Sequence, residues 1–324
     1  MNDRLLAILD LLHENRGEFI SGQEISSQLD ISRTAVWKYI KKLRGMDYEI
    51  ESRSSRGYKL RGIPDRLVPE EVVRGLGNHK FGRNLKVFAS LGSTNNKARE
   101  LIEKGAGEGT IVVAEEQTRG KGRRGRRWFS PPGAGLWFSI ITEPDFSPGE
   151  APLLTVAALL AVHDILLARG LSAEVKWPND ILLNDKKVCG ILSELIVQPD
   201  TINYAIIGIG MNVNQTSFPE LLGEKATSLR IFSGNRVNRV ILLQAILNKF
   251  VLYYNRLPEE QEDIISSWKN RLQLIGREII IESAGNEYRG KAVDISQRGE
   301  LLLQDESGEI QSFWAGDTSL VKED

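Results

Sequence analysis

The sequence has little of what several classes of site and fold require. It contains one cysteine, Cys189, and three histidines, which excludes an intrachain disulfide and argues against a zinc site of cysteine and histidine. The formal net charge is −1, so contacts with nucleic acid or phosphate must come from local patches. We find no apolar run of the roughly 18 residues that span a membrane. The first residues lack the features of a signal peptide, so we expect a cytoplasmic protein.

What is present indicates a globular protein of more than one domain. The chain has 324 residues, of which 41% are hydrophobic and 26% charged. We expect three parts: a helical region over residues 1–64, an alternating α/β region over 65–272 and an all-β region over 273–324. Two prolines, Pro64 and Pro69, make the first junction a plausible linker.

The N-terminal region has the pattern of a winged helix-turn-helix. Ser21, with Glu24 three residues later, predicts a helix start, and Ser32 can cap a third helix from Arg33 to about Arg44. Two short strands then flank residues 52–56 and predict a hairpin. Residues 1–31 hold two basic side chains against six acidic ones, whereas residues 32–61 hold nine against three.

This basic half is the half expected to face DNA. A solvated helical interaction module is the alternative. The candidate DNA-binding residues are Arg33, Thr34, Trp37, Lys38, Lys41, Arg53 and Arg56.

The central region alternates helical and strand patterns. A long apolar helix is expected over residues 151–169, and other helices over 93–103, 237–256 and 258–272. Strands are expected over residues 110–114, 136–141, 174–177, 188–195 and 204–208. Beyond about residue 273, apolar residues alternate with turns, which predicts a small β-barrel.

The most distinctive segment is residues 119–128, Arg-Gly-Lys-Gly-Arg-Arg-Gly-Arg-Arg-Trp. Six of its ten residues are cationic and three are glycine, which opposes both a strong helix and a core strand. Dense positive charge attracts phosphate, and glycines let backbone N–H groups approach an anion closely. We expect a flexible loop that closes over a phosphorylated ligand.

Two further segments have both a structural and a functional interpretation. Residues 93–95, Ser-Thr-Asn, suit either a helix cap or a small polar ligand. Residues 176–180, Lys-Trp-Pro-Asn-Asp, end a predicted strand, where ligands of α/β proteins bind. Asp180 could hold Mg²⁺ together with nucleotide phosphates, although Asn179 and Asp180 also form a good turn pair.

Taken in order, these segments resemble the biotin protein ligases. The resemblance rests on Ser-Thr-Asn, Gln117, the basic glycine loop, Lys-Trp-Pro-Asn-Asp, residues 187–192 (Lys-Val-Cys-Gly-Ile-Leu), residues 208–214 (Gly-Ile-Gly-Met-Asn-Val-Asn) and residues 226–229 (Ala-Thr-Ser-Leu). With the basic N-terminal domain, the chain is similar to the bifunctional bacterial form that also represses the biotin operon. One departure is Lys121, where the family often has arginine; charge is kept but bidentate phosphate geometry is lost.

The resemblance implies a fold, an activity and site residues. The core would resemble class II aminoacyl-tRNA synthetases, followed by an SH3-like domain. Biotin would contact Ser93, Thr94, Asn95, Gln117, Gly120, Lys121, Gly122, Arg123 and Lys187. ATP would contact Arg123, Arg126, Trp128, Lys176, Asn179, Asp180 and Asn212. The catalytic residues would be Lys187, Arg123, Arg126 and Asp180, with Asp180 as ligand of Mg²⁺.

The implied reaction joins biotin and ATP into biotinyl-5′-AMP and passes biotin to a lysine of the biotin carboxyl carrier protein. Operator DNA and a homodimer formed with the adenylate are the other implied partners. A carboxylate that attacks an α-phosphate needs cations and Mg²⁺ more than a protein nucleophile, and the chain offers no convincing nucleophile set. A lipoate ligase and a repressor that only senses an anion are the alternatives.

Overall fold

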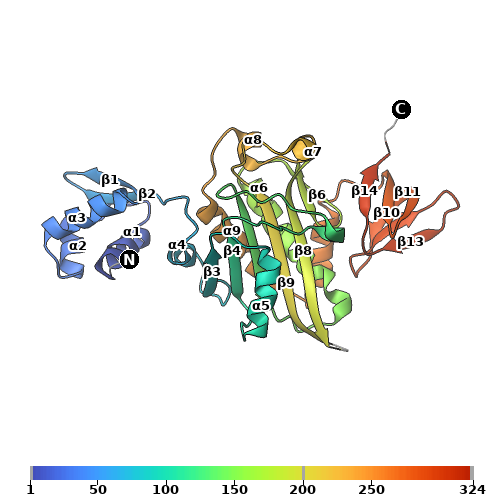
Figure 1. The fold of residues 1–324 in the computed structure, drawn as a ribbon, viewed down its shortest axis with the longest axis horizontal. Coiled ribbons are helices and arrows are strands. Elements are labelled where there is room, and N and C mark those ends of the chain that lie inside the picture. The colour runs from blue at the N-terminus through green and yellow to red at the C-terminus, as the bar shows by residue number, and fades with distance from the viewer. Residues whose placement is uncertain (1–2, 199–200, 322–324) are drawn as a thin grey trace. The chain divides into compact units, whose positions relative to one another are not determined.

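The computed structural model describes residues 3–198 and 201–321. The chain divides into two compact units, Met1–Arg66 and Leu67–Asp324 (Figure 1). Each unit has its own buried core, and each is described by itself below.

The first unit contains three helices and a hairpin, as predicted. Its elements are α1 (Asp3–Glu14), α2 (Gly22–Gln28), α3 (Arg33–Arg44), β1 (Glu49–Arg53) and β2 (Gly57–Gly62). The two serines identified from the sequence are caps: Ser21 Oγ accepts from the N–H of Glu24 at 3.0 Å, and Ser32 Oγ accepts from the N–H of Ala35 at 3.1 Å. These bonds satisfy amides that the first helical turn leaves unpaired. The helix-turn-helix with its hairpin is therefore confirmed.

Helix α3 is amphipathic and is anchored to the hairpin. Val36, Ile40 and Leu43 are buried, whereas 53% of Trp37 is exposed. Arg44 donates from Nε and Nη2 to the carbonyl oxygen of Ile50, at 3.0 and 2.6 Å. The polar face of α3 is thus fixed relative to the hairpin within this unit.

The second unit is built on a seven-stranded mixed sheet with the order β3-β4-β5-β9-β8-β7-β6. β3 and β4 are parallel and the other neighbours are antiparallel, which confirms the expected mixed sheet. The strands are β3 (Asn84–Phe88), β4 (Thr110–Ala114), β5 (Gly135–Thr142), β6 (Ala173–Lys176), β7 (Asp180–Leu183), β8 (Lys186–Gln198) and β9 (Thr201–Asn212). β3 and β7 were not expected from the sequence.

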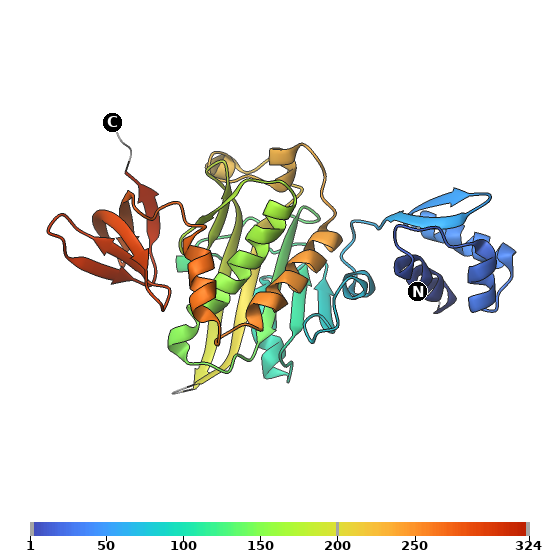
Figure 2. The same cartoon turned by 180° about the vertical axis from the view of Figure 1, so that it is seen from behind.

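Helices cover both faces of this sheet. α5 (Thr94–Glu103) packs on β4, β5 and β9, while α6 (Pro152–Ala168) packs on the opposite face, where Figure 2 shows it together with α9 and α10. The remaining helices are α4 (Pro69–Arg74), α7 (Glu220–Gly223), α8 (Leu229–Ser233), α9 (Arg239–Tyr254), α10 (Gln261–Lys269) and the short 3₁₀ turns η1 (Arg123–Gly125) and η2 (Pro148–Glu150).

The segment that contains α6 corrects one expectation. Residues 148–168 are long and apolar enough to cross a membrane by length and composition, although we expected no such run. In the structure 67% of its most apolar stretch is buried inside the protein. Packing between the sheet and two neighbouring helices explains the composition, because such a helix is apolar on all sides.

The C-terminal part is a five-stranded antiparallel sheet with the order β13-β12-β11-β10-β14. The strands are β10 (Glu278–Ser283), β11 (Asn286–Ile295), β12 (Leu301–Gln304), β13 (Ile310–Phe313) and β14 (Asp317–Leu320). The expected all-β domain is confirmed. Within the described residues its outer strands β13 and β14 do not pair, so the sheet is not closed by strand hydrogen bonds.

A charged network joins α6 and α9 to the segment that follows α10. Asp164 of α6 accepts from Tyr253 Oη of α9 at 2.7 Å and from Arg271 Nη2 at 2.9 Å, and Lys249 Nζ lies 3.1 Å from Oδ2. Burial alone would raise the pKa of the Asp164 carboxyl, but the hydrogen bonds of these groups and of His163 hold that pKa well below its usual range. The carboxylate therefore stabilises the folded state.

We predict that Asp164→Asn lowers the free energy of unfolding at pH 7 by about 2 kcal/mol, because three donors lose a charged acceptor. The pKa is depressed on folding, so the contribution is fully present above the unfolded pKa of about 3.9 and is lost as pH falls below it. Urea unfolding at pH 7 and pH 3 measures both effects. Exposed Asp145→Asn is the control, and an equal difference between wild type and Asp164→Asn at both pH values would contradict the prediction.

Candidate functional site

One cavity of about 730 Å³ in the second unit collects most of the predicted ligand-binding residues. Those that line it are Ser93, Thr94, Asn95, Gln117, Lys121, Gly122, Arg123, Arg126, Trp128, Lys176, Asn179, Asp180, Lys187 and Asn212. Gly120 does not line the cavity. It lies at the base of the basic loop, where an added Cβ would meet the carbonyl oxygen of Trp128 at 2.6 Å.

Glycines on two neighbouring strands make the floor of this cavity. Gly190 of β8 pairs with Gly210 of β9, and Gly208 lies two residues before Gly210. A Cβ on Gly208 would lie 2.2 Å from Asn95 Oδ1, and one on Gly210 would lie 2.6 Å from Trp128 Nε1. The missing side chains therefore leave the space that Asn95 and the Trp128 indole occupy.

The polar end of the cavity is formed at the start of α5. Ser93 holds the N-cap position, yet its side chain makes no capping hydrogen bond. Gln117 Oε1 accepts from the backbone N–H of Thr94 at 2.8 Å and from its hydroxyl at 3.1 Å. Asn95 Nδ2 donates to the carbonyl oxygen of Leu192 at 3.2 Å. Ser93, Thr94 and Asn95 are buried and Gln117 is partly buried, and all four are organised around the cavity instead of merely ending a helix.

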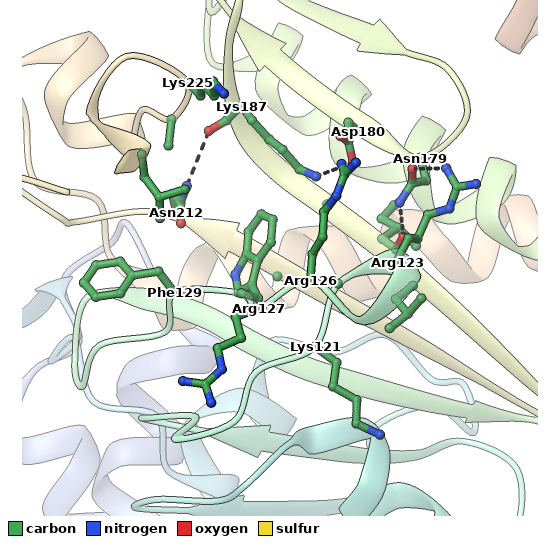
Figure 3. A pocket seen from close by; sticks show the side chains of 18 of the residues that line it. Lys121, Arg123, Arg126, Arg127, Phe129, Asn179, Asp180, Lys187, Asn212 and Lys225 are labelled. Carbon is green, nitrogen blue, oxygen red and sulfur yellow. Dashed lines mark hydrogen bonds and ion pairs between the residues drawn. The ribbon is translucent and has the colours of Figure 1, made fainter. Parts of the chain in front are cut away.

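The basic loop adopts a defined conformation in which four of its cations, Lys121, Arg123, Arg124 and Arg126, have side-chain partners. Arg123 Nη1 donates to Asn179 Oδ1 at 3.0 Å, and Asn179 Nδ2 donates to the carbonyl oxygen of Ile191 at 2.6 Å (Figure 3). Lys121 Nζ donates to Asn96 Oδ1 at 2.7 Å. Asn179 therefore holds Arg123 against the sheet, in addition to its place in the turn between β6 and β7.

Arg126 has a partner that the sequence did not reveal. Arg126 Nη2 binds Asp317 of β14, and Arg124 Nη1 lies 3.3 Å from the same carboxylate. Arg124 Nη2 also donates to the carbonyl oxygen of Glu282 at 3.0 Å. The C-terminal sheet thus holds the loop, and 64% of the Arg126 side chain remains exposed.

A lysine and a carboxylate form the charged centre of the cavity. Lys187 Nζ lies 2.7 Å from Asp180 Oδ1 and 5.1 Å from the centre of the Trp128 ring. Figure 3 shows Lys187 and Asp180 pointing toward one another, with Lys121 directed away from them. Asn212 Nδ2 donates to the backbone carbonyl oxygen of Lys187 at 3.4 Å, which ties β9 to this centre.

Burial tunes the cation beside this pair. Burial lowers the pKa of the Arg123 guanidinium, while the negative charges of Asp180 and Asp317 raise it by a smaller amount. The group stays protonated because its ordinary pKa is so high. A partly desolvated guanidinium interacts more strongly with an anion than a fully solvated one.

Several lining residues were not singled out from the sequence. Besides Asp317, they include an apolar wall at α7 and its neighbours: Phe129, Phe218, Leu221 and Leu222. Phe129 and Phe218 lie edge to face, with ring centres 6.2 Å apart. A flat apolar group would fit this wall, whereas the cations suit an anion. The cavity can therefore take a ligand with a polar head, a negative centre and a flat apolar end.

In the first unit, a hollow of about 820 Å³ lies between α3 and the hairpin. Arg33, Thr34, Trp37, Arg53 and Arg56 line it, whereas Lys38 and Lys41 are exposed on α3 but do not. Arg53, Arg56 and Lys59 all lie within 5.6 Å of the Phe19 ring centre, which gathers positive charge at the hairpin. This arrangement suits a phosphate backbone.

The side chains around Asp180 determine whether a metal ion could be held there. Residues 3–198 and 201–321 contain no group of three or more histidine, cysteine, aspartate or glutamate side chains arranged to hold one. Asp180 supplies one carboxylate, already opposite Lys187. Such a site fits a magnesium ion that arrives with nucleotide phosphates and does not fit one held by protein ligands alone.

Comparison with known proteins agrees with this organisation. Residues 87–212 match the biotin/lipoate A/B protein ligase family, residues 4–59 an HTH domain, and residues 274–321 the biotin protein ligase C-terminal domain. The bifunctional ligase/repressor BirA of Bacillus spizizenii is 39% identical over 317 residues, which is 97% of each chain. The biotin–[acetyl-CoA-carboxylase] ligase of Mycobacterium tuberculosis is 32% identical over 78% of this chain and 97% of its own.

A solved structure supports the same assignment. The biotin protein ligase of Aquifex aeolicus in complex with biotin and ATP superposes with a TM-score of 0.64 at 29% identity, over 74% of this chain and 100% of that one. The similarity to the ligase/repressor proteins extends over both units and nearly the whole sequence. This chain therefore belongs to the bifunctional ligase/repressor family of biotin protein ligases.

Proposed function

We propose that this protein activates biotin with ATP to biotinyl-5′-AMP and transfers biotin to a lysine of the biotin carboxyl carrier protein of acetyl-CoA carboxylase. The observation that carries the proposal is a single cavity in which the hydrogen-bonding groups around Thr94 face the same space as Lys187 and Arg123. Membership of the family and the names of the similar proteins support it.

The cavity is suited to a ligand with two different ends. The ureido ring of biotin would meet Ser93, Thr94, Asn95 and Gln117, with Gly122 and Lys121 at the loop side, so that its carboxylate extends toward Lys187. ATP would place its phosphates near Arg123, Arg126, Lys176 and Asn212 and its base toward Trp128. Biotin and ATP as substrates agree with the ligands of the Aquifex aeolicus complex.

Adenylation joins two negatively charged groups. A biotin carboxylate oxygen forms a bond to the α-phosphorus, and the bond from that phosphorus to the bridging oxygen breaks, so that pyrophosphate leaves. Lys187 and Arg123 would offset the repulsion between these two negatively charged groups, and their fixed partners Asp180 and Asn179 would keep them oriented. In the second step the acceptor lysine attacks the biotinyl carbonyl carbon and AMP leaves.

The basic loop would also protect the mixed anhydride. Its backbone between Gly120 and Gly125 lines one side of the cavity through Lys121, Gly122 and Arg123. Covering the adenylate excludes water, which would otherwise hydrolyse it. Magnesium, when it arrives with the nucleotide, would neutralise phosphate charge, with Asp180 as the protein group that would hold it.

We propose a second activity for the first unit, repression at operator DNA. Arg33, Thr34, Trp37, Lys38 and Lys41 of α3 would enter the groove, and Arg53 and Arg56 would contact phosphate. One such unit contacts only a short half-site, so we also propose a homodimer that forms with the adenylate bound. We also propose that the protein is cytoplasmic. Its domains would span residues 1–64, 65–272 and 273–324.

The first test of the ligase proposal is exchange of labelled pyrophosphate into ATP. Exchange should depend on biotin, because the adenylate forms only with the correct carboxylic acid. Exchange supported by lipoate and not by biotin would favour the lipoate ligase alternative.

We predict that Lys187→Ala slows adenylate formation about 100-fold, since loss of one preorganised charge costs about 3 kcal/mol in the barrier. Single-turnover formation of the adenylate measures this rate. Lys186→Ala is the matched control, because Lys186 is the exposed neighbour and does not line the cavity. Equal rates for the two variants would remove Lys187 from the mechanism.

For repression we predict that biotin plus ATP strengthens binding of operator DNA and shifts the protein to a dimer, since the dimer contacts two half-sites. Affinity should fall with salt at a slope of about −0.9 per phosphate contacted, and Arg53→Ala should make that slope shallower. Titration of operator DNA alongside sedimentation measures both. Lys291→Ala, exposed on β11 of the second unit, is the control, and affinity and oligomeric state indifferent to the adenylate would refute the coupling.

A further inference from the structure

A fully buried serine lies behind the polar end of the cavity. Ser139 of β5 has no exposed surface and does not line the cavity. Its Oγ lies 2.8 Å from Thr94 Oγ1 and 2.7 Å from Asn95 Oδ1. A serine in an otherwise apolar strand gives no local sequence signal, and no role was expected for it.

The direction of each hydrogen bond around Ser139 is fixed by backbone groups. Gln117 must present its oxygen to Thr94, because the Thr94 backbone N–H donates to it. The Thr94 hydroxyl therefore donates its hydrogen to Gln117 Oε1. Asn95 must turn its oxygen toward Ser139, because its Nδ2 donates to the carbonyl oxygen of Leu192.

These directions leave Ser139 as the donor to the oxygens of Thr94 and Asn95. Ser139 has a single hydroxyl hydrogen but two acceptors within reach, Thr94 Oγ1 and Asn95 Oδ1. The Thr94 hydroxyl already donates to Gln117, so the Ser139 hydrogen goes to Asn95 Oδ1, the nearer acceptor at 2.7 Å, and holds that oxygen in place. Because Asn95 lines the cavity, the second lone pair of its Oδ1 can accept a ligand N–H.

We propose that Ser139 is a positioning residue that sets Asn95 Oδ1 to accept an N–H of the ligand, and so selects a cyclic urea head over a head without N–H groups. Gln117 Nε2, which donates one hydrogen to Ser130 Oγ at 3.1 Å, keeps a second one for the urea carbonyl. A dithiolane ring offers neither group. The inference rests on biotin being the substrate.

The experiment measures KM and kcat of the intact protein for biotin and for its two lactam analogues, in which one or the other ureido N–H is replaced by CH₂. Wild type should show a KM at least about tenfold higher for one analogue, because Asn95 Oδ1 then loses its hydrogen bond from the ligand. In Ser139→Ala the KM for biotin should rise about tenfold, with kcat and the KM for ATP unchanged. The KM for the analogue divided by the KM for biotin should fall to about two.

Ser193→Ala is the matched control. Ser193 Oγ lies 2.8 Å from Thr155 Oγ1 on α6, on the other face of the same sheet, so the variant also loses a bond between hydroxyls. It should keep the wild-type ratio. Ser139→Cys, which retains a weaker donor, should lie between wild type and Ser139→Ala.

Two results would overturn the inference. One is equal KM values for biotin and both analogues in wild type, and the other is a ratio that Ser139→Ala and Ser139→Cys leave at its wild-type value. Both differ from failure of the ligase proposal, in which wild type would show no biotin-dependent exchange of pyrophosphate.

Discussion

Mutual repulsion among cations is the constraint on which the candidate site depends. Six cationic residues occur within residues 119–128, and three lysines outside that loop, Lys176, Lys187 and Lys225, line the same cavity. The structure gives the central ones defined partners: Asn179 for Arg123, Asp180 for Lys187 and Asp317 for Arg126. Positive charge is thereby held in place without being cancelled, because the cations of the cavity still outnumber its carboxylates.

Space for the ligand is the second requirement, and glycines in the sheet provide it because they have no side chains. Gly190, Gly208 and Gly210 lie on adjacent strands beneath Asn95 and Trp128. Most of the residues that flank these glycines in the two strands are apolar and buried, so the floor is rigid while its surface is open. Rigidity matters because charged groups stabilise a reacting phosphate only when they need not reorganise during the reaction.

Much of this organisation could be predicted from the sequence because it is local. The strand at Thr110–Ala114 and the helix after Ser93 follow from apolar pattern and capping, and the basic loop follows from composition. β7 was missed because Asp180 begins a strand of only four residues after a turn. Asp317 and Ser139 were missed because their roles arise only when distant strands meet the loop and α5.

The uniform apolarity of α6 has a consequence for synthesis of the chain on the ribosome. The helix ends at Ala168, whereas β8 and β9, central strands of the sheet that it covers, follow at residues 186–212. A nascent chain therefore carries an uncovered, membrane-like helix until those strands have emerged. Exposed apolar segments of this kind promote aggregation and recruit chaperones, so the order of translation leaves residues 148–168 open to both until the sheet has formed.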